Sequence, residues 1–181
     1  SAAEEVRKKN EKISRELEKL NRKALEDSRD SIRKLKKILD DAHKDSREII
    51  KEIEDLLRKR RDEDVRKRVE ELLRRLEERT RKVIKEIRER SKEDEERVKE
   101  VHEENKKISE DVKREVKEVR DRGEVSDEVV EEIKRSNDEN NERSKKVLDE
   151  IKKLNKEVND RVEELLERDK RELERVKRDV D

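Results

Sequence analysis

Apolar side chains recur every three or four residues along nearly the whole chain. One run extends from Val6 to Leu56, a second from Val65 to Val119, and a third begins at Val130. Steps of three and four residues place side chains on one face of an α-helix. The steps of the first run average about 3.57 residues, between the 3.5 of a coiled coil and the 3.6 of a straight helix. The pattern therefore predicts three long, nearly straight amphipathic helices.

Helix start signals divide the chain into three nearly equal parts. Ser1 and Glu4 have the spacing of a capping box, and Asp62 and Ser126 each precede acidic residues that suit the positive end of a helix dipole. The lone glycine, Gly123, lies just before the third start. We expect helices over 2–60, 63–121 and 127–180. The expected fold is all-α, a nearly straight up-down-up antiparallel three-helix bundle with helices of about 55 residues, forming a single domain over residues 1–181.

Two segments imitate capping boxes inside the expected helices. They begin at Ser91 and Ser136, and each has an acidic residue three positions later. If they ended the helices, five shorter segments would result. No Gly or Pro lies near either serine, and the apolar period continues through both. We therefore interpret both segments as helix interior.

Polar side chains occupy many positions on the apolar faces. Because an unpaired polar group is costly in apolar surroundings, their recurrence predicts buried hydrogen bonds, although residues at the edge of a face can also contact water. Such groups usually set register and partner choice. The candidates for buried polar networks are Asn10, Ser14, Asn21, Ser28, Ser31, His43, Ser46, Thr80, Ser91, Asp94, His102, Asn105, Ser109, Ser136, Asn137, Asn140, Ser144, Asn155 and Asp169.

Antiparallel neighbours allow these candidates to be matched. With turns near residues 61 and 124, the numbers of facing residues sum to about 122 for the first two helices and to about 248 for the last two. Asn105 then faces Ser144, with Asn21 and His102 one turn away. Near one end of the bundle, two residues of the first helix approach four others: Asn10 and Ser14 meet Ser109, Ser136, Asn137 and Asn140.

The same arithmetic places Thr80 beside His43 and Asp169. A hydrogen bond between His43 and Asp169 would raise the pKa of the histidine, whereas burial among neutral partners would lower it. The layer positions favour the hydrogen-bonded pair. No third group or oxyanion donor accompanies the two residues, so we interpret the pair as structural and predict no catalytic residue.

Composition limits the remaining functions. Charged residues make up 62% of the 181 residues and apolar residues 26%, which by itself favours disorder. However, 56 basic side chains balance 56 acidic ones, and the chain has one Gly and no Pro, so long helices are favoured. There is no Cys, and the two histidines lie in different layers, so we expect no metal site and no cofactor.

The sequence gives few signals about binding partners or cellular location. The basic stretch 58–61, with Arg66, Lys67 and Arg68, is typical of a solvated helix end, and with no aromatic residue and zero net charge it predicts no nucleic-acid binding. No apolar run is long enough to span a membrane, and no signal peptide is recognisable, which leaves the location unknown. The chain begins with Ser1 rather than Met, which favours a removed tag or leader.

These caps, short turns, Val/Ile/Leu faces, Glu/Lys/Arg surfaces and Asn/Ser/His clusters resemble those of computationally designed helical bundles with buried hydrogen-bond networks. The resemblance implies a structural scaffold without natural biochemical activity, needing no partner. Two alternatives stay open. Doubled apolar positions such as Ile49-Ile50 and Leu165-Leu166 favour an interaction module that binds a designed helical partner or self-associates. The other alternative is a natural structural coiled-coil segment.

Overall fold

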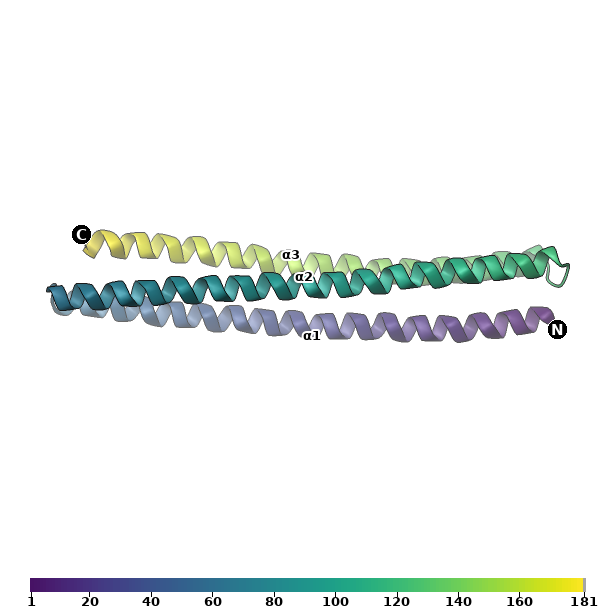
Figure 1. Ribbon diagram of the computed structural model, residues 1–181, viewed down its shortest axis with the longest axis horizontal. Helices are drawn as coiled ribbons and strands as arrows, with labels where there is room; N and C mark the ends of the chain where they lie inside the picture. Colours follow the sequence, from purple (N-terminus) through teal and green to yellow (C-terminus); the bar gives the residue numbers. More distant parts are fainter. Residues whose placement is uncertain (181) are drawn as a thin grey trace. The chain divides into compact units, whose positions relative to one another are not determined.

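The computed structural model describes residues 1–180; Asp181 and the side chain of Val180 lie outside the described part. Three helices follow one another along the chain: α1 (Ala2–Lys59), α2 (Glu63–Asp121) and α3 (Asp127–Val180) (Figure 1). The described residues contain no strand. The predicted helices are confirmed to within one residue, and neither Ser91 nor Ser136 interrupts its helix.

Each helix begins with the side-chain cap that the sequence predicts. The cap oxygen accepts a hydrogen bond from the backbone amide three residues on, at 3.3 Å for Ser1, 2.9 Å for Asp62 and 3.4 Å for Ser126. These bonds satisfy amides that have no partner within the helix. Two residues without Pro or Gly, Arg60 and Arg61, therefore suffice between α1 and the cap of α2.

The end of α2 depends on its glycine. Gly123 has a φ of 76° and donates from its amide to the carbonyl of Arg120 at 2.7 Å, while the amide of Glu124 donates to Val119 at 3.2 Å. This pair of bonds defines a Schellman motif, which closes the last turn of a helix. A positive φ strains any residue with a Cβ, so glycine is favoured at this position.

The chain divides into two compact units, each with a segment of all three helices. Unit 1 comprises Ser1–Asp30 and Glu93–Lys153. In unit 1 the ion pairs Arg7–Glu132 and Glu18–Arg143 join α1 to α3 at the same difference in residue number, so these helices run parallel. Its apolar core contains mainly valine, including Val112, Val116, Val125, Val129, Val130 and Ile133.

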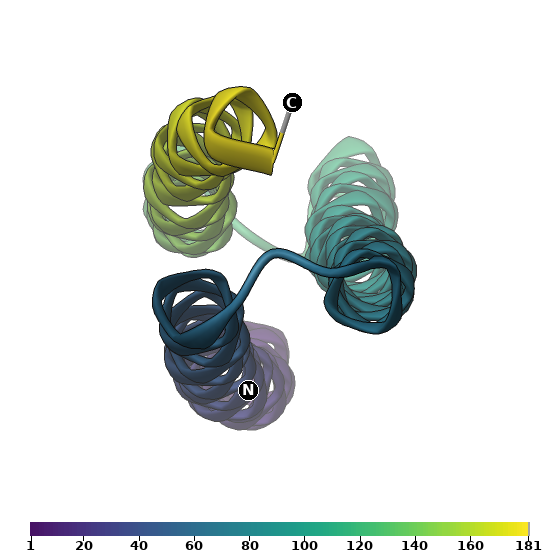
Figure 2. The ribbon, with the colours of Figure 1, turned by 90° about the vertical axis from the view of Figure 1, so that its left-hand side faces the viewer.

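Unit 2 comprises Ser31–Lys92 and Leu154–Asp181. Figure 2 faces this unit, whose three helices lie at the corners of a triangle with the turn after Lys59 crossing from α1 to α2. The ion pairs Asp40–Arg161 and Glu54–Arg175 again share one difference in residue number. The core here has larger side chains: Ile49, Ile50, Ile53, Val65, Val69, Leu72, Leu76 and Val176.

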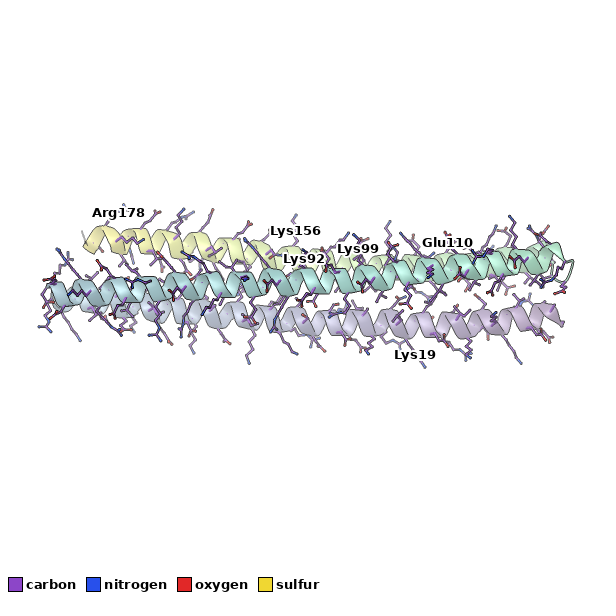
Figure 3. All side chains as sticks on the ribbon, in the orientation of Figure 1. Lys19, Lys92, Lys99, Glu110, Lys156 and Arg178 are labelled. Carbon is purple, nitrogen blue, oxygen red and sulfur yellow. The ribbon has the colours of Figure 1, made fainter. Side chains whose placement is uncertain are left out.

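Charged side chains cover the outer faces of the helices. The six side chains labelled in Figure 3 are all charged and exposed: Lys19, Lys92, Lys99, Glu110, Lys156 and Arg178. Among the described residues, no large hydrophobic side chain is exposed. None of the helices, over the described residues, is apolar over the length needed to cross a membrane.

Candidate functional site

The structure buries most of the polar candidates within the two units. Fourteen are buried: Asn10, Asn21, Ser28, Ser46, Ser91, Asp94, His102, Asn105, Ser109, Asn137, Asn140, Ser144, Asn155 and Asp169. The other five are half-buried: Ser14, Ser31, His43, Thr80 and Ser136. Each position follows from the helical period, because a residue on the apolar face is turned toward the other helices whatever its chemistry.

In unit 1 a five-residue network joins α1 to α3, here called the Asn10 cluster: Asn10, Ser14, Ser136, Asn137 and Asn140. Asn10 donates to the hydroxyl of Ser136 at 3.2 Å and accepts from the amide of Asn137 at 3.0 Å. Asn140 donates to Ser14 at 3.2 Å, and the hydroxyls of Ser14 and Ser136 lie 3.4 Å apart. These bonds join the polar side chains of α1 to those of the parallel helix α3.

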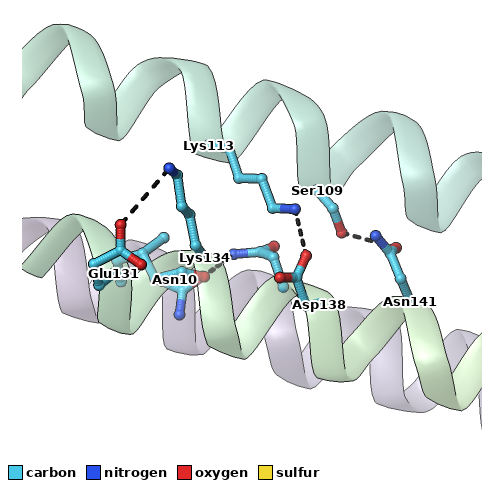
Figure 4. A network of polar contacts seen from close by, with 9 residues as sticks. Asn10, Ser109, Lys113, Glu131, Lys134, Asp138 and Asn141 are labelled. Atoms are coloured by element: carbon cyan, nitrogen blue, oxygen red, sulfur yellow. Dashed lines mark hydrogen bonds and ion pairs between the residues drawn. The ribbon is translucent and has the colours of Figure 1, made fainter.

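Two polar contacts join α2 to α3, and their α3 residues are close in sequence to those of the Asn10 cluster (Figure 4). Ser109 donates to the side-chain oxygen of Asn141 at 3.1 Å, and Lys113 forms an ion pair with Asp138. The sequence arithmetic placed Ser109 with the Asn10 cluster, but Ser109 bonds instead to a half-buried residue outside the predicted set. The sums of residue numbers predict how far along the bundle axis a residue lies. The direction in which its side chain points around the helix decides its hydrogen-bond partner.

Two asparagines form the most complete polar pair of unit 1. Asn21 of α1 donates to the Oδ1 of Asn105 at 3.2 Å, and Asn105 of α2 donates back to the Oδ1 of Asn21 at 3.0 Å. The second hydrogen of the Asn105 amide bonds to the carbonyl of Val101 at 2.7 Å. Asn105 is fully buried and Asn21 nearly so, hence each supplies the other with the partners that water would otherwise provide.

His102 bonds to Ser144, which the arithmetic had placed opposite Asn105. The Nδ1 of His102 lies 2.5 Å from the hydroxyl of Ser144, and that hydroxyl donates to the carbonyl of Asn141 at 2.9 Å. Because the serine has a single hydrogen, His102 donates from Nδ1. Burial, followed by the charge of Lys106, lowers the pKa of His102 below 6.5. The neutral imidazole is therefore the favoured form.

A buried carboxylate of unit 1 has an exposed cation as its partner. Asp94 is 3% exposed, and the guanidinium of Arg97 lies 2.8 Å from its Oδ1. The same guanidinium nitrogen lies 3.4 Å from the hydroxyl of the fully buried Ser28. Arg97 reaches inward along the helix surface, which long basic side chains do readily. The apolar period gave no signal for this residue, although its spacing of three from Asp94 is that of an ion pair on one helix face.

Unit 2 satisfies its polar groups less completely. Asn155 of α3 donates to the backbone carbonyl of Ser91 in α2 at 2.9 Å, and Ser46 donates to the carbonyl of Ala42 at 2.9 Å. Of six buried side-chain atoms without a hydrogen-bond partner among the described residues, five belong to unit 2. They are Nδ1 of His43, Oγ of Ser91, Oδ1 of Asn155, Oδ1 of Asp169 and Oε2 of Glu172.

His43 and Asp169 line one cavity with Thr80, so the structure brings these three residues together. However, no hydrogen bond joins the two titratable side chains, and Nδ1 of His43 and Oδ1 of Asp169 both lack a partner. The hydrogen-bonded pair favoured by the layer positions is therefore absent. Burial is the main cause that raises the pKa of Asp169 above 3.8, and the nearby His43 opposes it. Two side chains in one layer can still be separated by a cavity.

Within residues 1–180, no group of three or more His, Cys, Asp or Glu side chains is arranged to hold a metal ion. Three basic residues near the first turn have acidic partners: Arg58 pairs with Asp55, Arg60 with Asp62, and Arg68 with Glu52 and Glu71. The charges of these three residues are thus locally balanced.

The chain is similar to a solved structure described as a computationally designed three helix bundle. The two chains share 24% sequence identity, with a TM-score of 0.50, over 98% of this chain and 85% of that one. The likeness shows a three-helix-bundle fold. No protein-family model matches the chain, and no curated protein sequence matches it. The resemblance to designed bundles with buried hydrogen bonds is confirmed for the fold and for the presence of hydrogen-bonded polar side chains in the interior.

Proposed function

We propose that this chain is a designed single-domain scaffold without natural biochemical activity, in which the buried polar side chains specify how its helices pair. The reciprocal bonds between Asn21 and Asn105 carry this proposal. A slip of either helix by one residue would turn one amide away and leave two buried polar groups unpaired. Apolar side chains tolerate such slips better, because apolar contacts have no direction.

The polar character of the surface supports a protein that needs no binding partner. The outer faces are charged, and large apolar side chains are not exposed in the described part of the chain. A stable interface between proteins usually needs an apolar patch that neither partner covers by itself. We therefore propose that the scaffold is monomeric and is not an enzyme.

A variant in which the asparagines become apolar tests the proposal. Asn10, Asn21, Asn105, Asn137 and Asn140 would all be replaced by Leu, and light scattering and amide NMR spectra would be compared with those of the parent chain. We expect the parent to have a mass near 22.1 kDa and one set of amide signals. The variant should remain helical but show several masses or several sets of signals, because its helices can pair in more than one way. A variant that stays monomeric with one set of signals contradicts the proposal.

An interaction module is the second candidate, since unit 2 has a groove at its surface that a partner could fill. A groove of about 460 Å³ lies between α2 and α3, lined by Ile84, Leu166 and Leu173 among charged residues. These three apolar side chains are half-buried. Self-association of the parent chain would favour this candidate, and it would appear as a mass well above 22.1 kDa that falls on dilution.

A further inference from the structure

Unit 2 contains a cavity of about 30 Å³ lined by side chains from all three helices. Most of its wall is apolar, with Leu39 from α1, Ile87 from α2 and Val162 from α3. Asp169, His43, Ser46 and Thr80 supply the polar part of the wall. A cavity of this size has room for one or two water molecules, or for the polar head of a small ligand (roughly 10–15 Å³ each).

Two atoms at this cavity have unused hydrogen-bonding capacity. Asp169 is 8% exposed, yet its Oδ1 has no hydrogen-bond partner, and Nδ1 of His43 has none either. The hydroxyl of Ser46 donates to the carbonyl of Ala42. Buried polar atoms are nearly always hydrogen-bonded, and a carboxylate oxygen that lacks a partner calls for a donor.

The cavity lies against the larger groove between α2 and α3. Thr80, Ile84, Leu166 and Asp169 line both spaces. The groove, of about 460 Å³, continues along Leu173 with charged residues on its rim. A molecule with its head at Asp169 therefore has room in the groove for an apolar body that contacts Ile84, Leu166 and Leu173.

The charge around the cavity favours a cation. Burial is the largest cause that raises the pKa of Asp169, and the carboxylate of Glu172 adds to it. The charges of His43 and Arg47 and a hydrogen bond from Ser46 offset this rise only in part, so the ionised form of Asp169 is not fully compensated. Arg47 lies near, but its guanidinium bonds to Glu172 at 2.9 Å. No Lys or Arg side chain of the described residues forms an ion pair with Asp169, in contrast to Asp94 with its Arg97. With fewer than three grouped ligands, a metal ion is a poorer fit than an organic cation.

We propose that the cavity at Asp169 and the adjoining α2–α3 groove form a binding site for a small primary amine with an apolar body. The ammonium donates to Oδ1 of Asp169 and to the hydroxyl of Thr80 at the junction of the two spaces. The apolar body lies along Ile84, Leu166 and Leu173.

Benzylamine is a suitable probe, with benzyl alcohol and benzoate as controls of the same shape. Each would be titrated into the full chain labelled at the Ile, Leu and Val methyl groups, with NMR readout at Ile84, Leu166 and Leu173. We expect benzylamine to shift these signals to saturation with a Kd of roughly 1 mM, as befits so small a ligand. Benzyl alcohol should bind at least about tenfold more weakly, because it lacks the charge-assisted hydrogen bond, and benzoate should not bind.

Two variants with a matched control locate the site. Asp169→Asn keeps the shape of the side chain and should weaken benzylamine binding about tenfold or more. Thr80→Leu fills the junction and should abolish binding, with the helical circular dichroism retained. Asp94→Asn changes the other buried carboxylate, which has its own cation, and should leave the affinity unchanged. Equal binding of benzyl alcohol, an unchanged affinity in Asp169→Asn, or the absence of saturable shifts would each overturn the proposal and leave a cavity that holds only water.

Discussion

Replacing one asparagine of the Asn21–Asn105 pair by leucine should cost more than replacing both. The two amides exchange hydrogen bonds of 3.2 and 3.0 Å, and Asn21 has no further side-chain hydrogen bond within the described part of the chain. In Asn105→Leu the amide of Asn21 therefore keeps its burial but loses its partner. In the double variant, leucine faces leucine and no polar group is left behind.

The magnitude follows from the burial of the two residues, which are 6% and 0% exposed. An unsatisfied buried amide costs about 1–3 kcal/mol, partly offset by the apolar area that the new leucine buries. We expect each single variant to lose about 1–2 kcal/mol of unfolding free energy. The double variant should equal or exceed the parent chain, since replacing both partners removes the desolvation penalty. The coupling free energy should then reach about 2–4 kcal/mol.

Urea unfolding followed by circular dichroism measures all four members of this double-mutant cycle. Asn21→Leu combined with Asn137→Leu is the control, because these residues share no hydrogen-bond partner and their effects should add. If the Asn21 and Asn105 changes also add to within about 0.5 kcal/mol, the reciprocal bonds contribute nothing beyond the burial of each residue, and the reasoning fails.

Three further predictions concern single residues. His102→Gln should make the stability of the chain less sensitive to acid. Burial lowers the pKa of His102, so the unfolded chain binds the proton more readily, and the stability present above pH 6.5 is lost as pH falls through the folded-state pKa. Urea midpoints of the parent and the variant, measured across this pH range, test the prediction. Asp169→Asn should stabilise the chain at neutral pH, and this gain should shrink as pH falls toward 3.8. The pKa of Asp169 is raised in the folded chain, so ionisation of Asp169 destabilises the parent as pH rises, and the variant avoids this loss. An equal gain at all pH values contradicts the prediction. Gly123→Ala should cost about 1 kcal/mol from the positive φ alone, since a Cβ there meets no atom within 4 Å; a neutral result in thermal melts would show that the turn rearranges freely.

The helices could be predicted because their signals are local. The caps at Ser1, Asp62 and Ser126 act within three residues, and the glycine of the Schellman motif ends α2 where the sequence places it. The capping sequence at Ser136 fails as a start because the residues before it continue the helix and its apolar face. Burial could be predicted for the same reason, since a position on the apolar face determines exposure for Asn as it does for Val.

The partners of the polar residues could be predicted only in part. Residue sums placed Asn105, Asn21, His102 and Ser144 near one another, but not the division into an Asn21–Asn105 pair and a His102–Ser144 pair. That choice depends on rotamers and on the rotation of each helix about its axis, neither of which a period encodes. Arg97 lay outside any pattern of burial, because its charged end reaches a buried carboxylate from an exposed position.

Replacement of Asn105 in unit 1 and of Asp169 in unit 2 should thus change the free energy of unfolding in opposite directions. Asn105 in unit 1 has a complete set of partners, so its loss leaves a neighbour unpaired and destabilises the fold. Asp169 in unit 2 has an oxygen without a partner and a raised pKa, so its charge already destabilises the folded chain and its loss relieves that cost. The proposed specification of helix pairing uses Asn105 through groups within the chain. The proposed binding site uses the Oδ1 of Asp169, an ionisable oxygen that has no hydrogen-bond partner among the described residues.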